Sequence, residues 1–194
     1  MRSHKQPQPS RAPRRRLAVT VIAVASLTLL LMPATQAAEH DRRVNSSGEV
    51  MPASSQDDLA EVRGAVARYH TPERAEDAGW GLIEGLHHCF EDPALGGMGY
   101  HYIDADQLDD PTLDPLRPES LVFVPGPSGR LRLGAVEYIV PVELWNEPEP
   151  PSVLGQELHI LEPVEGVEVW GLHVWLFEFN PDGVFADWNP RVSC

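Results

Sequence analysis

The stretch EVWGLHVWLFEFNPDGVFADWNPRVSC, residues 168–194, decides what kind of fold the chain adopts. Its first half is rich in Val, Leu, Trp and Phe, and its second half carries the turn-forming pairs Asn-Pro and Asp-Gly. Alternate side chains of a strand lie on opposite faces, so His173 shares a face with Trp175 and Phe177. Because both faces are apolar, the pattern predicts a strand buried on both sides, with His173 in the interior.

Upstream of this strand, other segments show the same pattern of apolar runs between turn residues. Apolar runs bounded by Pro, Gly or Asn are typical of strands and turns, and they occur in SLVFVP (120–125), LRLGAVEYIVPVEL (131–144), SVLGQELHIL (152–161) and VEVWGLHVWLFEF (167–179). PGPSGR, between the first two, predicts a hairpin turn. Gly96, Gly97 and Gly99 predict a turn before an extended segment at residues 100–104, and an acidic, Pro-rich loop follows.

The section that precedes these strands carries helix signals. Apolar residues recur at helical spacing after a predicted N-cap at Asp57 or Asp58, and they are Leu59, Val62, Val66 and Tyr69. Thr71 followed by Pro72 marks a second helix start. The predicted fold class is therefore α+β, with an N-terminal helical section followed by a mainly antiparallel, barrel-like β-sheet.

Residues 1–37 have the composition of a cleaved export signal. Three arginines precede the uncharged run LAVTVIAVASLTLLLM, and small residues end at Ala37. The run is shorter than the roughly 20 residues of a spanning helix, and an uncleaved anchor is the alternative reading. We expect residues 38–57 to be a flexible lead and 58–194 a single domain. The protein is predicted to be secreted or extracytoplasmic, with no stable membrane association after signal cleavage.

The charge of the exported part excludes one class of partner. The chain has 15 Lys and Arg against 29 Asp and Glu, and six of the cations but none of the acids lie in residues 1–37. The remaining nine cations and 29 acids give a net charge of −20. Such a surface repels phosphate backbones and anionic lipids. We expect no nucleic-acid partner, and the sequence leaves the oligomeric state open.

The two cysteines, Cys89 and Cys194, are predicted to form a disulfide, because an exported chain enters an oxidising compartment. The bond closes a loop of about 100 residues and contributes about 4–5 kcal/mol in the chain-entropy account. It also keeps the last residue from fraying. The alternative reading is a reactive thiol.

Three polar residues interrupt apolar runs on three separate segments: His101 in GYHYID, Glu137 in GAVEYIVP and His173 in GLHVW. A buried carboxylate is costly unless it is paired or coordinated. Two imidazoles and one carboxylate satisfy a divalent metal ion of unspecified identity and leave a coordination position open. Aromatic residues on the same strands predict a ligand pocket around the site, formed by Tyr138, Trp175 and Phe177.

The alternative for these three residues is structural, with a hydrogen-bonded Glu–His pair or separately satisfied core histidines. Other candidates are weaker. His87 and His88 adjoin Cys89 and are read as structural, His159 is a possible fourth ligand, and Met98 is a possible copper ligand or a filler of a gap in the core. The chain contains no G-x-S-x-G, H-E-x-x-H, phosphate-loop or C-x-x-C motif.

The segments GMGYHYID, LRLGAVEYIVP, LGQEL and LHVWLFEFNPDGVFADWNPRVSC resemble an uncharacterised family of small secreted bacterial proteins. The resemblance covers Leu59 to Cys194, and its C-terminal motif is the most specific part. It supports both the disulfide and the His–Glu–His site, because these residues lie inside the motifs. A more distant resemblance, through an MG-x-H element, is to β-barrel domains of the TTHB210-like kind. Neither resemblance implies a reaction.

The leading functional hypothesis is a binding module that holds a divalent metal ion or a small ligand at His101, Glu137 and His173. The second hypothesis is a metal-dependent hydrolase or redox enzyme with Glu137 as base and the histidines on the metal. The third is a structural or surface-interaction protein with no such site.

Overall fold

The computed structural model describes residues 53–194, with side chains from Gln56 onward. The predicted signal, residues 1–37, lies outside the described residues, as does most of the predicted lead, residues 38–57. No helix in the described part of the chain is long and apolar enough to cross a membrane.

A helical section precedes the sheet in the chain, as predicted. Its helices are α1 (Ala53–Val66), the 3-10 helix η1 (Ala67–Tyr69) and α2 (Pro72–Glu76). The predicted cap at Asp57 or Asp58 is wrong, because α1 already begins at Ala53, and residues 53–56 contain no Gly or Pro to interrupt a helix. The second start is confirmed, with Thr71 as N-cap and Pro at the first position of α2.

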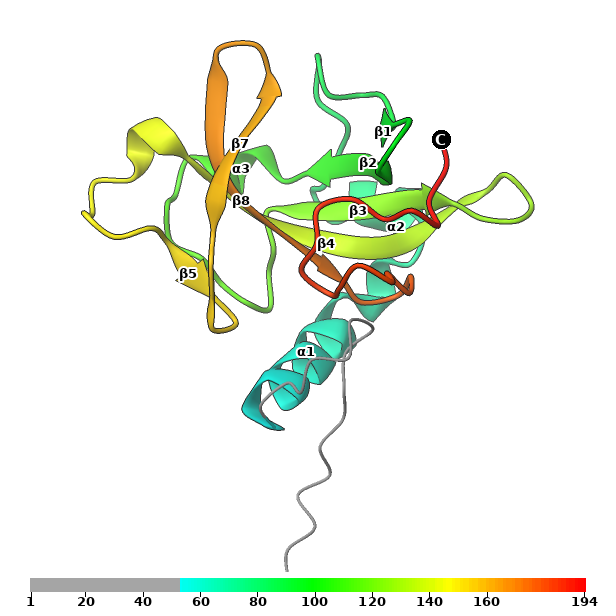
Figure 1. The fold of residues 1–194 in the computed structure, drawn as a ribbon, viewed down its shortest axis with the longest axis horizontal. Coiled ribbons are helices and arrows are strands. Elements are labelled where there is room, and N and C mark those ends of the chain that lie inside the picture. The colour runs from blue at the N-terminus through cyan, green and yellow to red at the C-terminus, as the bar shows by residue number, and fades with distance from the viewer. Residues whose placement is uncertain (1–52) are drawn as a thin grey trace, which may run out of the picture. The chain divides into compact units, whose positions relative to one another are not determined.

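Six antiparallel strands form one sheet in the order β1-β2-β3-β4-β8-β7, curled into a half-barrel whose edges are β1 and β7 (Figure 1). The α+β, barrel-like fold class is confirmed. The strands are β1 (Phe90–Asp92), β2 (Gly96–Ile103), β3 (Ser120–Pro125), β4 (Leu131–Pro141), β7 (His159–Val164) and β8 (Val167–Trp175). The short pair β5 (Ser152–Val153) and β6 (Gln156–Glu157), the helix α3 (Ala105–Leu108) and the 3-10 helix η2 (Val142–Leu144) lie in the connections.

The glycines predicted to open a turn instead begin β2. Gly96 and Gly99 have φ angles of +95° and +112°, which glycine adopts without strain. Gly97 pairs with Asn189, and a Cβ added at Gly97 would lie 2.7 Å from a methyl group of Val192. The absence of side chains therefore lets the C-terminal segment lie directly against β2.

The two faces of the sheet bury different clusters. On one face, α1 packs through Val62 and Val66 against a large cluster that includes Tyr138, Leu172 and Val174. The other face buries a smaller cluster beneath the C-terminal segment, formed by Val122, Val124, Ala135, Trp175 and Val192. The alternation of side chains along β4 and β8 places Glu137 and His173 on the second face, together with Ala135 and Trp175.

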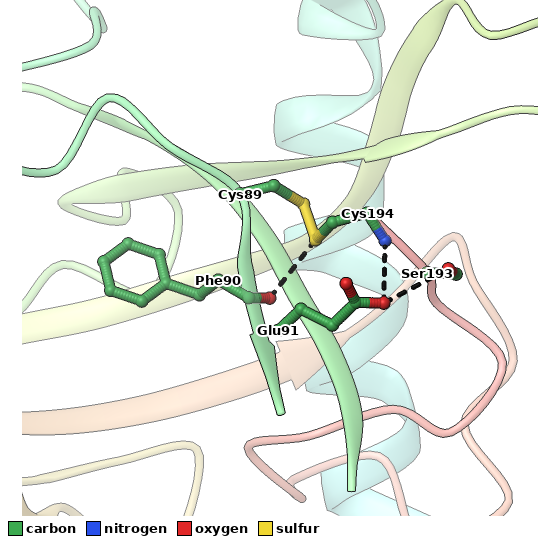
Figure 2. Close-up of a disulfide and its surroundings, with 5 residues drawn as sticks. All are labelled: Cys89, Phe90, Glu91, Ser193 and Cys194. Carbon is green, nitrogen blue, oxygen red and sulfur yellow. Dashed lines mark hydrogen bonds between the residues drawn. A yellow bond between two sulfur atoms is a disulfide. The ribbon is translucent and has the colours of Figure 1, made fainter. Parts of the chain in front are cut away.

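The predicted disulfide is present between Cys89 and Cys194 (Figure 2). It joins the residue before β1 to the last residue of the chain. The Glu91 carboxylate reinforces this join, because its Oε1 accepts hydrogen bonds from the Ser193 hydroxyl and the Cys194 N–H, each at 3.1 Å. The C-terminus is thus fixed to the β1 edge of the sheet.

Candidate metal centre

Three strands bring the three predicted ligands together. His101 lies on β2, Glu137 on β4 and His173 on β8, and their exposed fractions are 6%, 5% and 0%. Glu137 is directly opposite His173 in the β4–β8 register. His101 comes from two strands away, across β3, where His101 pairs with Val122 and Glu137 pairs with Ser120. The curl of the sheet lets His101 reach the other two.

The side-chain heads of the triad are in direct contact. The two Nε2 atoms of His101 and His173 are 3.1 Å apart, and His101 Nε2 is 3.3 Å from Glu137 Oε2. Nδ1 of His173 lies 3.5 Å from Glu137 Oε1. With one ligand atom taken from each residue, all three atoms lie within 4.8 Å of one another, so the triad is able to hold a metal ion.

Burial controls the charge of the triad. It raises the pKa of Glu137 to about 8, and the charges of Asp187 and Glu119 act in the same direction. Burial lowers the pKa of His101 to about 4, against a smaller opposing effect of the Gly99 backbone. Burial also lowers the pKa of His173 well below 6.5, helped by His101 and His159. Without a cation, the triad at neutral pH is a neutral acid beside two neutral imidazoles, and its contacts are not ion pairs.

Two aromatic rings orient the imidazoles. Phe90 meets the His101 ring edge-on at 5.2 Å, and Trp175 stacks on His173 at 6.1 Å. Nδ1 of His173 is buried and makes no hydrogen bond. Buried polar atoms nearly always have a partner, so this nitrogen is available to a ligand that the protein itself does not supply.

The three residues predicted to form an aromatic pocket have separate surroundings in the structure. Tyr138 faces the α1 side, where its hydroxyl donates to the Pro115 carbonyl at 2.6 Å. Trp175 touches His173 but donates its indole N–H to the Ala186 carbonyl at 2.6 Å. Phe177 packs in the α1 cluster, because β8 ends at Trp175 and the alternation of side chains ends with it.

A different cavity adjoins the triad, with a volume of about 480 Å³. None of the three predicted aromatic residues lines it. Its walls come from β2, β4, β7, β8 and the loop before β1, and His101 and Glu137 lie among the lining residues. Met98 also lines it and is 9% exposed.

The other histidines do not join the triad. His159 pairs with Asp187 at 2.9 Å and is half-exposed, and the ring of His88 lies tilted against that of Phe90 beside the disulfide. Neither they nor His87 belong to the group of described residues able to share an ion.

Sequence reasoning missed two buried polar residues next to the site. Glu119 is 1% exposed, accepts the Ile139 N–H at 3.0 Å, and has its pKa raised to about 7 by burial. The hydroxyl of Ser120 is buried and makes no hydrogen bond. Both follow Pro118 at the end of a polar loop, and only their position at the start of the apolar run of β3 could have indicated burial.

Comparison of the chain with protein-family models, with curated proteins and with solved structures gave no match. The resemblances drawn from the sequence motifs therefore stay predictions.

Proposed function

We propose that the protein is a binding domain for one divalent transition-metal ion, held by His101, Glu137 and His173. One observation carries the proposal: two imidazoles and a carboxylate from three different strands meet in the interior with their ligand atoms within 4.8 Å of one another. A buried carboxyl without a cation is kept only in its neutral form. An ion there allows Glu137 to ionise and gives the unpartnered His173 nitrogen a bond.

The distances support an ion of zinc size. In a tetrahedral site with bonds of about 2.1 Å, ligand atoms lie about 3.4 Å apart. Two contacts in the triad match this spacing, with His101 Nε2 3.3 Å from Glu137 Oε2 and His173 Nδ1 3.5 Å from Glu137 Oε1. A set with one ligand atom from each residue lies within 4.8 Å, so the side chains have to move closer together when they bind the ion. Two nitrogens, one oxygen and an open position suit Zn²⁺ or Fe²⁺ better than Mg²⁺ or Ca²⁺.

Metal content tests this proposal. We expect protein produced from the full chain and reconstituted with Zn²⁺ or Co²⁺ to hold one ion per molecule by elemental analysis after desalting. His101→Ala and His173→Ala remove a ligand and should lower the affinity at least about tenfold. His70→Ala, which removes an exposed histidine outside the triad and outside the cavity, is the matched control and should keep the ion.

Circular dichroism and thermal unfolding separate loss of a ligand from loss of the fold. If the folded wild-type protein takes up no ion at micromolar concentrations, or if His70→Ala loses it as readily as His173→Ala, the proposal is wrong. The triad is then a hydrogen-bonded core cluster, as in the structural reading.

A metal-dependent hydrolase or redox enzyme is the second candidate, and the cavity beside the triad favours it, because a substrate there reaches Glu137. In this mechanism the two histidines hold the ion and Glu137 acts as the general base. Glu137→Gln separates the two candidates. If Glu137 is the base, the variant keeps its metal and loses turnover in an activity screen. If Glu137 is a ligand, the variant loses metal affinity.

We also propose that the protein functions outside the cytoplasm. The Cys89–Cys194 disulfide is consistent with an oxidising compartment. The absence of nucleic-acid and membrane partners is proposed on the acidic charge of the chain alone.

A further inference from the structure

The cavity beside the triad has the size and the lining of a small-molecule site. Its volume of about 480 Å³ lies within the range of ligand pockets, which is about 300–1,000 Å³. Most of its wall is apolar and includes Leu86, Phe90, Met98, Ile139 and Leu161. Apolar surface of this extent favours the apolar body of a small molecule over water.

The triad forms one polar spot in this apolar wall. His101 and Glu137 line the cavity, whereas His173 is completely buried behind them. An ion bound by the three residues therefore has the cavity on one side and the sheet on the other. A donor atom of a molecule in the cavity is able to complete the coordination of the ion.

The remaining charges around the cavity have one sign. Glu143, Glu162 and Glu168 line it and are exposed, and Asp187 lines it while paired with His159. Among the described residues that line the cavity there is no Lys or Arg. A molecule with an anionic group away from the ion meets only repulsion here, while a neutral or cationic tail does not.

We infer that this cavity binds a small molecule with an apolar body and no anionic tail, whose donor head coordinates the ion held by the triad. The inference rests on the proposed metal site. It adds the class of ligand, which neither the three metal ligands nor their geometry specifies.

Alkyl hydroxamates provide the test, because the hydroxamate head chelates zinc and the tail can be varied. The Zn²⁺-loaded protein is titrated with acetohydroxamate, octanohydroxamate, and two octyl analogues that end in a carboxylate or an ammonium group. We expect octanohydroxamate to bind at least about tenfold more tightly than acetohydroxamate, since its extra methylenes are buried. The carboxylate-ended analogue should bind at least about tenfold more weakly than the ammonium-ended one.

A pair of variants locates the binding. Leu86→Trp fills the cavity from a loop and should remove the advantage of the octyl chain while leaving acetohydroxamate binding intact. Leu95→Trp, at a residue 50% exposed and outside the cavity, is the matched control and should bind as the wild type does. The comparison of chain lengths on the wild type remains decisive if Leu86→Trp does not fold.

The possible failures are distinguishable. If the protein binds no metal, the proposed function and this inference are both wrong. If it binds the metal but does not distinguish octanohydroxamate from acetohydroxamate, the inference alone is overturned. Equal binding of the carboxylate-ended and ammonium-ended analogues overturns it as well.

Discussion

The Glu137 carboxyl is neutral in the metal-free fold and ionised in the unfolded chain at neutral pH. Its pKa in the folded protein is about 8, against an ordinary value of 4.5. Folding therefore favours its protonated form, and the stability that this provides is complete below pH 4.5 and is lost as the pH rises through 8. Glu119 acts in the same sense, with a pKa raised to about 7.

The two histidines of the triad act in the opposite sense. Because burial lowers their pKa values below 6.5, folding favours the neutral imidazoles, and stability is lost as the pH falls below 6.5. Between pH 4.5 and 6.5 the carboxyls and the imidazoles oppose each other. Above 6.5 the imidazoles are neutral in both states, and only the carboxyls remain.

We predict that the metal-free protein loses about 2 kcal/mol of unfolding free energy between pH 6.5 and 8. Urea unfolding in the presence of a chelator measures this. Glu137→Gln should keep only the smaller decrease caused by Glu119. Saturating Zn²⁺ should also remove most of the loss, because Glu137 is ionised when it binds the ion. A flat stability curve for the metal-free wild type from pH 6.5 to 8 contradicts the prediction.

The disulfide joins two short segments at the edge of the sheet, each of which also pairs with β2. β1 has three residues and lies at the edge, whereas the triad lies on β2, β4 and β8 within the sheet. Removing the bond therefore weakens the fold more than it weakens the site.

For Cys89→Ser/Cys194→Ser we expect the unfolding free energy to fall by about 2–5 kcal/mol while one metal ion is still bound at 25 °C. Thermal unfolding and metal content measure the two effects. Unchanged thermal stability would show that Glu91 and the glycine contacts alone hold the C-terminus.

The sequence predicts those strands whose own side chains form an apolar run between turn residues. β3, β4 and β8 are apolar runs between turn residues, and the structure places them in those runs. β2 begins earlier than predicted, because Gly96 and Gly97 have no side chain to show a strand pattern. What makes them a strand is the C-terminal segment that lies against them, and this contact is invisible in the local sequence.

The residues of the site could be predicted from the sequence, but their contacts could not. His101, Glu137 and His173 stand out because each interrupts an apolar run, but their convergence depends on the curl of the sheet. The cavity beside the triad was not predicted, because part of its wall comes from the loop before β1 and from β7, whose approach to the triad no local pattern shows. Tyr138, the direct neighbour of Glu137, has to face the other side of the strand.

On the scale of the whole chain, the net charge, the disulfide and the N-terminal segment all favour export. The chain has a disulfide and, after residue 37, a net charge of −20. We predict that its apolar N-terminal segment directs it out of the cytoplasm. Retention in the cytoplasm would leave both thiols reduced.

We therefore predict that a bacterial host exports the protein and cleaves it after Ala37. Intact-mass measurement and N-terminal sequencing of the extracytoplasmic fraction should give a chain that begins at Ala38 and is about 2 Da lighter than its reduced form, since a disulfide removes two hydrogens. Protein of full mass in the membrane fraction would favour the anchor reading instead.

The half-barrel does not close, and β7 forms one of its two margins. Unpaired strand margins invite other chains to add to them. Here Pro163 has no N–H to donate, and the neighbouring Glu162 is exposed and carries a charge. If a second molecule added a strand at this edge, it would form fewer backbone hydrogen bonds and would contact a surface of like charge. The open side of the barrel is thereby protected against polymerisation.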